Sequence, residues 1–268
     1  QDEVYSAAWT QNLSASISNA SEKGSYLFSA NYINQNGLMD NTFYKRFTGR
    51  VNSTYNFSEY VRVGENLMVA RWNNRGADTN GDRGIPYSAM RQHPAIPVYS
   101  ANGVFADPSA LLGSDIDNPV QTLYNMRDNT NTSWRIFGNA YIEIMPIKGL
   151  TLKSNVGIEH VQYLSKTLGR NVRPTDESLN RSVSRAYGEG DTYTWTNTAN
   201  YLFDLGKDHH FTFLAGTEAT KYNFEDISAM RKDYAFEDSD YMQLGSGSGT
   251  QTNGGGKQEW ALFSLFGK

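Results

Sequence analysis

Apolar and polar positions alternate over long stretches of the chain, most regularly between residues 43 and 72. One parity of the first half is mainly apolar and carries Phe43, Phe47, Val51, Tyr55 and Phe57. The other parity carries Tyr44, Arg46, Thr48, Arg50, Asn52, Thr54 and Asn56. Because successive side chains of a strand point to opposite faces, this pattern predicts a strand with one apolar and one polar wall. A Ser58–Glu59 turn follows, and the alternation then resumes with Val61, Val63, Leu67 and Val69.

The length of this hairpin indicates where it belongs. Strands of soluble domains usually run about 5–6 residues, whereas these approach the roughly 9–11 residues that cross a bilayer at a tilt. The same alternation predicts about nine strands: residues 11–19, 25–34, 43–57, 61–72, 132–145, 150–164, 192–203 and 211–224, and one entered at Trp260. We therefore predict an all-β fold, an antiparallel up-and-down transmembrane β-barrel fragment.

The connections alternate between short and long along the chain. The longest ones are predicted at residues 73–131, 165–190 and 225–256, and the last ends in the low-complexity sequence GSGSGTQTNGGG. Proline and glycine in residues 73–131 exclude long regular elements there. Bacterial barrels place long loops outside the cell and short turns in the periplasm, so we expect these three loops to be extracellular.

Composition supports a barrel and excludes some other classes. Hydrophobic residues make up only 38% of the 268 residues, yet aromatic residues reach 13%, which suits a wall that faces lipid with alternate residues and carries aromatic girdles. The net charge of −4 argues against nucleic acid as the main partner. There is no cysteine, so disulfides and thiol chemistry are excluded. No apolar run approaches the roughly 18 residues of a transmembrane helix.

The two ends suggest a longer protein. The sequence from Gln1 is polar and has no signal-peptide pattern, and the residues after Trp260 enter a strand. We expect the ends to be cuts through a longer chain, with a mature N-terminus at Gln1 as the alternative.

Several segments resemble one known family. YINQNGLMDNTFYKRFTGRVNSTYNFSEYVRVGENL resembles the barrel of SusC/RagA-type TonB-dependent transporters of Gram-negative bacteria. AMRQHPAIPVYSANGVF, NPVQTLYN and LTLKSNVGIE resemble later landmarks of that family in the same order, and WALFSLFGK resembles the start of a following strand. The similarity covers nearly the whole chain.

This resemblance implies a function and a set of partners. Residues 1–268 would form a middle portion, about nine strands, of a 22-stranded outer-membrane barrel with an N-terminal plug. The complete protein would import oligosaccharides, glycans or peptides, capped by a SusD-type lipoprotein and energised by TonB–ExbB–ExbD. The plug and the TonB-contacting segment are not in this sequence, so no residue here can be assigned to gating.

Two groups of residues are candidates for binding. Aromatic and basic residues of the first long loop are candidates for stacking on sugar rings or contacting the lid protein: Tyr87, Arg91, Tyr99, Phe105 and Tyr124, with Trp134 beyond them. The alternative is that the aromatic rings pack among themselves or belong to the interface girdle. Three arginines on the polar parity, Arg46, Arg50 and Arg62, are predicted to line the lumen, where they steer anionic substrates or pair with plug carboxylates.

Metal binding and catalysis have weaker support. Asp78, Asn80 and Asp82 place oxygen ligands at alternate positions, as calcium loops do. The glycine and glutamate that an EF-hand needs at its sixth and twelfth positions are replaced by Arg83 and Ala89, so a solvated turn is the favoured interpretation. No nucleophile elbow, phosphate-binding loop or zinc motif occurs, and we expect no enzyme activity and no cofactor.

Two alternatives to a transporter remain open: a surface carbohydrate-binding β-domain whose apolar faces meet across a sandwich core, and an outer-membrane adhesin or barrel enzyme. One residue conflicts with a lipid-facing wall, because Glu65 falls on the apolar parity between Val63 and Leu67. A bulge near Gly64 or cover from a neighbouring subunit would each explain it.

Overall fold

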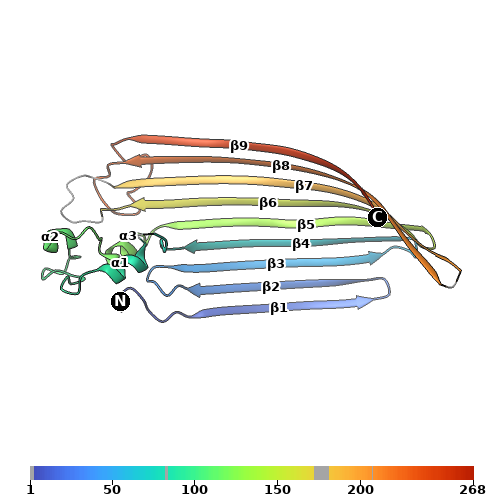
Figure 1. Ribbon diagram of the computed structural model, residues 1–268, viewed down its shortest axis with the longest axis horizontal. Coiled ribbons are helices and arrows are strands. Elements are labelled where there is room, and N and C mark those ends of the chain that lie inside the picture. The colour runs from blue at the N-terminus through green and yellow to red at the C-terminus, as the bar shows by residue number, and fades with distance from the viewer. Residues whose placement is uncertain (1–2, 82–83, 172–180, 207) are drawn as a thin grey trace.

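The computed structural model describes residues 3–81, 84–171, 181–206 and 208–268, and its main element is one antiparallel sheet of nine strands (Figure 1). The strands are β1 (Thr10–Ser21), β2 (Gly24–Asn36), β3 (Phe43–Asn56), β4 (Val61–Arg75), β5 (Thr130–Ile147), β6 (Leu150–Gly169), β7 (Ser182–Leu205), β8 (His209–Lys232) and β9 (Gln251–Gly267). Each strand pairs with the next in the chain, which confirms the predicted up-and-down antiparallel arrangement.

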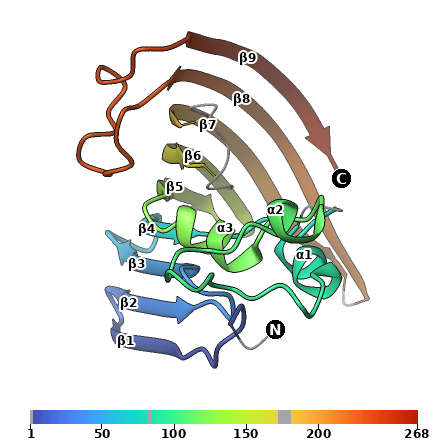
Figure 2. The ribbon, with the colours of Figure 1, turned by 90° about the vertical axis from the view of Figure 1, so that its left-hand side faces the viewer.

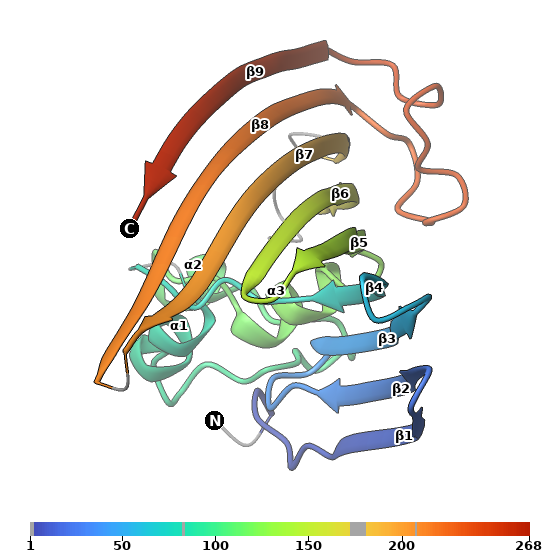
Figure 3. The ribbon, with the colours of Figure 1, turned by 90° about the vertical axis from the view of Figure 1, so that its right-hand side faces the viewer.

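The sheet is strongly curved and open. Figures 2 and 3 show an arc of strands with the helices α1 (Ile85–Arg91), α2 (Pro108–Leu112) and α3 (Pro119–Asn125) on its concave side. The connection between β8 and β9, residues 233–250, lies on the convex side. Strands β1 and β9 are the two edges of the sheet. Among the described residues, none of the helices has the length and apolar character needed to cross a membrane.

The apolar parity of the strands faces the convex side. Leu168 of β6 and Val183 of β7 are buried against Tyr234 and Met242 of the convex connection. Directly paired residues of an antiparallel ladder lie on the same face, so the register carries this orientation from strand to strand as far as Val51 in β3. The apolar parity of the predicted strand, carried by Val51 and Tyr55, therefore faces outward from a curved sheet. No second sheet covers this face within the described residues, so the sandwich alternative has no support.

Aromatic rings border the convex face at both ends. At the end with short turns, Phe203 stacks with Phe211 and Phe213 at centroid distances of 5.2 and 5.7 Å. Toward the other end, the Arg71 guanidinium lies 5.2 Å from the Trp134 ring centroid. Between these rings the convex face of β3 to β5 is mainly apolar, with Glu65 as the exception, an arrangement typical of a barrel wall with aromatic girdles. Trp134 therefore belongs to the convex face and not with the loop residues predicted to bind ligand.

The strands β6 to β9 are longer than the sequence pattern predicted, and two predicted loops were too long. The connection expected at residues 165–190 spans only 170–181, and the one expected at 225–256 spans 233–250. The alternation fades because polar side chains interrupt the apolar positions of the convex face there, with a His160–Asp191 contact of 2.7 Å and a Gln162–Tyr187 hydrogen bond of 2.7 Å. The glycines at 254–256, expected in a flexible loop, pair with β8. Backbone hydrogen bonds continue the ladder whatever the side chains are.

Glu65 lies on the convex face with a regular backbone around it. The ladders to β3 and β5 run past it without a register shift, so the bulge hypothesis is wrong. The Ser53 hydroxyl on the neighbouring strand donates to its carboxylate, with both Oγ–Oε distances 2.7 Å. A local hydrogen bond, not a change of strand geometry, therefore accommodates the charge.

Candidate ligand-binding site at the helical end of the sheet

Local sequence signals start and stop the short helices of the first long connection. The Asp107 carboxylate accepts hydrogen bonds from the backbone N–H groups of Ser109 and Ala110, and α2 ends at Gly113, whose φ is +63°. The Asn118 side chain caps α3 in the same way. A proline follows each cap at the first helical position, where its fixed φ suits the helix and its missing N–H leaves no bond unmade. The prediction that this connection lacks long regular elements is confirmed.

A small hydrophobic cluster fixes α1 and α3 against the N-terminal segment. Val4, Ile85 and Leu123 are buried together, and Met39 and Met126 pack around them. The Asn41 side chain also donates to the Leu123 carbonyl at 3.3 Å. Segments that are distant in sequence therefore form one packed unit on the concave side.

Three of the predicted binding residues form a row of rings on this unit. The Tyr99 and Phe105 rings stack with centroids 5.1 Å apart, and the Phe105 and Tyr124 centroids lie 5.4 Å apart. The Arg127 guanidinium lies over Tyr124, 3.9 Å from the ring centroid. Tyr99 is 48% and Tyr124 46% exposed. We call Tyr99, Phe105, Tyr124 and Arg127 the aromatic row. Exposed ring faces beside a guanidinium are suited to stacking against flat or apolar ligand surfaces.

Tyr87 and Arg91 form a separate pair on α1. The Arg91 guanidinium lies 5.1 Å from the Tyr87 ring centroid and 3.9 Å from the exposed Asp115 carboxylate. No ring contact within the described residues joins Tyr87 to the aromatic row. The exposed ion pair contributes at most about 1 kcal/mol. The structure thus divides the predicted group of five into two places.

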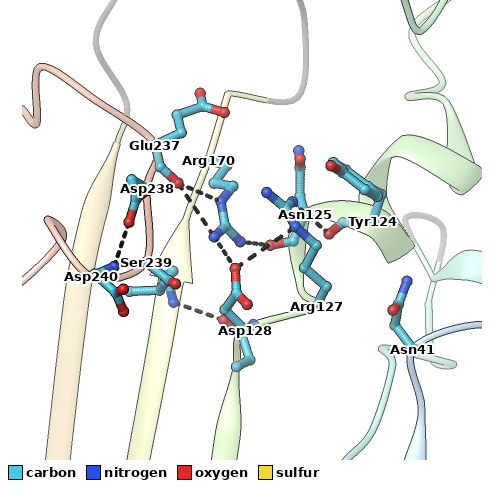
Figure 4. Close-up of polar contacts among 12 residues, drawn as sticks. Asn41, Tyr124, Asn125, Arg127, Asp128, Arg170, Glu237, Asp238, Ser239 and Asp240 are labelled. Carbon is cyan, nitrogen blue, oxygen red and sulfur yellow. Dashed lines mark hydrogen bonds and ion pairs between the residues drawn. The ribbon is translucent and has the colours of Figure 1, made fainter.

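A buried arginine connects the aromatic row to the convex connection (Figure 4). The Arg170 side chain at the end of β6 is fully buried. It donates to the Asn125 and Glu237 carbonyls and pairs with the Asp128 carboxylate. The Arg127 guanidinium lies 3.8 Å from Asp128 as well. The alternation pattern gave no sign of this role, although Arg170 lies in an arginine-rich stretch between two strands.

The connection 233–250 is held at a second point by Arg181. Its guanidinium pairs with the Glu237 carboxylate at 3.1 Å and donates to the Tyr234 and Ala235 carbonyls. Tyr234 is buried and its hydroxyl donates to the Gln243 carbonyl at 2.8 Å. Burial raises the pKa of this phenol, so it remains a neutral donor at physiological pH. The connection is therefore a fixed element and not a loose loop.

The three arginines predicted to line the lumen share the concave face but differ in their partners. Arg62 pairs with Glu143 at 3.5 Å and donates to Asn56 at 2.9 Å. Glu143 also pairs with Lys153 at 3.0 Å. The side chains of Arg46 and Arg50 have no hydrogen bond or ion pair with any described residue. The alternation pattern does not distinguish these two arginines from Arg62.

The predicted cation loop forms a turn in the part that can be described. The Asp78 carboxylate accepts from the Asn80 backbone N–H at 3.0 Å, which is an Asx turn. Asp82 lies outside the described residues. No group of three potential metal ligands occurs within the described residues. Calcium binding at Asp78 and Asn80 therefore stays the less favoured interpretation of this segment.

Comparison of this chain with known proteins identifies its relatives. No protein-family model matches the chain. TonB-dependent receptor P3 of Formosa agariphila is 28% identical over 284 residues, which cover 100% of this chain and 27% of that protein. TonB-dependent receptor SusC of Bacteroides thetaiotaomicron is 27% identical over 202 residues, which cover 72% of this chain and 18% of that protein. The chain thus spans about a quarter of the length of these curated relatives or less.

The solved structures agree with this result. The RagAB peptide importer in its closed-closed state matches 99% of this chain and 30% of its own, with a TM-score of 0.83 and 26% identity. BauA, the ferric preacinetobactin receptor of Acinetobacter baumannii, has a TM-score of 0.52 at 11% identity, which shows the fold alone. The chain is a homologue of part of the TonB-dependent receptor barrel. Among these receptors its relatives are of the SusC/RagA type, as the sequence resemblance indicated.

Proposed function

We propose that this chain is part of the wall of a TonB-dependent transporter that imports glycans or peptides across the outer membrane of a Gram-negative bacterium. The observation that carries the proposal is the match to the RagAB peptide importer over 99% of the chain at 26% identity. The apolar convex face supports it, because a barrel wall in a membrane presents such a face to lipid. The relatives are described as receptors and importers, which supports transport over enzymatic activity.

We expect the complete transporter to work with a SusD-type lipoprotein that closes it from outside and with TonB–ExbB–ExbD. We place the helices α1 to α3 at the extracellular end of the barrel, since the long connections of bacterial barrels are extracellular. The aromatic row then faces either the entering cargo or the lid protein. The rings stack on one another, as the alternative interpretation expected, and the exposed faces of Tyr99 and Tyr124 support a contact with cargo or lid as well.

Uptake by intact cells tests this function. We expect deletion of the gene for the complete transporter to abolish uptake of a labelled peptide pool or a labelled oligosaccharide pool, and the pool affected identifies the cargo class. The variant Y99A/Y124A should lower uptake by about tenfold or more, because it removes two exposed ring faces worth roughly 1 kcal/mol each. Y241A is the matched control, since Tyr241 is an exposed tyrosine of the convex connection. Normal uptake of both pools after deletion would contradict the proposal.

A further inference from the structure

Charges on the concave face of the sheet are neutralised in one region and not in another. Arg135 pairs with Glu159 at 2.6 Å, and Arg62 and Lys153 both pair with Glu143. These pairs lie on β4, β5 and β6. Arg46 and Arg50 on β3 have no such partner within the described residues, and the buried Nε of Arg46 has no hydrogen bond. Two cations therefore remain uncompensated on one strand.

The surroundings of the two arginines are polar and contain no acid. They line a concavity of about 400 Å³ together with Ser14, Ser16, Ser29 and Asn31. These four side chains share the concave parity of Arg46 and Arg50 through the β1–β2–β3 register. No Asp or Glu lines the concavity. The serine hydroxyls supply further donors, while the Asn31 amide is already bonded to Asn12 at 2.7 Å.

We propose that Arg46 and Arg50 form a binding site for a carboxylate or a similar oxyanion on the inner wall of the barrel. The two residues are four apart on one strand, so their Cα atoms lie about 13 Å apart, and long side chains can converge on one group between them. A guanidinium offers two parallel N–H donors to a carboxylate, which is the geometry that such anions prefer. Arg62 is not part of the proposed site because its guanidinium is already paired with the Glu143 carboxylate.

The location of the site on an inner wall rests on the proposed function; its anion chemistry does not. The carboxylate can come from an acidic cargo or from another part of the transporter's own chain that fills the barrel. Both sources share the same chemistry, and the experiment separates them.

The first test is a crystal structure of the complete transporter soaked with sodium selenate. An anomalous selenium peak between Arg46 and Arg50 supports a site for free anions. A carboxylate of the transporter's own chain at that position supports the same chemistry and identifies the protein as its source. If the two guanidinium groups contact neither selenate nor a carboxylate, the proposal is wrong.

The second test compares binding of tetraglutamate and tetraglutamine to the purified transporter. Where selenate binds in the crystal, we expect R46Q/R50Q to weaken tetraglutamate binding at least about tenfold and to leave tetraglutamine unchanged, since each charge-assisted hydrogen bond contributes more than a neutral one. R46K/R50K retains the charge and should recover part of the affinity, which separates charge loss from misfolding. R62Q is the matched control and should change the affinity less than twofold. Equal losses of tetraglutamate affinity in R46Q/R50Q and R62Q would overturn the proposed anion site. Normal uptake after deletion of the transporter gene would instead overturn the proposed transport function.

Discussion

Glu65 is the one carboxylate within the apolar part of the convex face on β3, β4 and β5, and its only described donor is the Ser53 hydroxyl. Replacing Ser53 with alanine leaves that carboxylate without a donor on a face that otherwise meets an apolar environment. We expect S53A to lower the free energy of unfolding by about 1–3 kcal/mol. The measurement is urea unfolding of the complete transporter in lipid vesicles.

The double variant S53A/E65L serves as the control for this pair. This variant removes the Glu65 carboxylate together with its Ser53 donor. Replacing both partners of a hydrogen bond by apolar groups is nearly neutral or stabilising. We therefore expect it to be at least as stable as the wild type. If E65L alone destabilises the protein more than S53A does, the carboxylate has a further partner that the chain itself does not supply.

Gly64 illustrates a second constraint at the residue scale. A Cβ atom at this position would lie 2.5–2.8 Å from three atoms of the Tyr141 phenol, which covers it across the ladder. G64A should therefore destabilise the complete protein by about 1–3 kcal/mol, the usual cost of overpacking. G157A is the matched control, because Gly157 shares the concave face and its nearest neighbour would be 3.7 Å away. Chemical unfolding in vesicles checks both, and equal stability of the two variants would contradict this account.

At the scale of elements, Arg170 joins three segments: the end of β6, the end of α3 with the residues that follow it, and the connection 233–250. R170M keeps much of the side-chain volume but leaves the Asn125 and Glu237 carbonyls without their donor. Each unsatisfied buried group costs about 1–3 kcal/mol, so we expect the connection 233–250 to detach locally while the sheet stays intact. Faster amide hydrogen exchange and faster proteolysis in residues 233–250 are the measurements.

R185Q provides the comparison for Arg170. Arg185 also reaches this connection, but through a single exposed hydrogen bond to Gln243 at 3.1 Å. Exchange in residues 233–250 should therefore remain close to that of the wild type in R185Q. If both variants loosen the connection equally, burial of Arg170 does not determine its importance.

The elements differ in how far the sequence could predict them, for a physical reason. The hairpin of β3 and β4 was predicted almost to the residue because one of its faces is apolar along most of its length. The outer parts of β6 to β9 were assigned to loops because polar residues and glycines interrupt the apolar positions there, so the alternation is lost although the ladder continues. The aromatic row could be named from composition, but its assembly depends on how residues 76–129 cross the concave side, and periodicity carries no information about that path.

At the scale of the whole molecule, the nine strands leave two unpaired edges. β1 has 12 residues and β9 has 17, and each presents one row of backbone N–H and C=O groups without a partner strand. An open edge of this length is unfavourable in a membrane, because lipid offers no hydrogen bonds to the backbone. Outside a membrane the exposed apolar convex face and the edges both favour aggregation. In a membrane, both edges of the sheet therefore require a pairing partner.

This requirement predicts the behaviour of residues 1–268 produced alone. We expect them to aggregate when refolded into detergent micelles or vesicles, whereas the complete barrel should migrate as a compact species in unheated gel electrophoresis and shift on boiling. Supplying the remaining strands of the transporter as a separate chain during refolding should recover part of the compact species, because it pairs β1 and β9. A stable, compact monomer of residues 1–268 in vesicles would show that the edges are satisfied in another way, by closure of this sheet on itself.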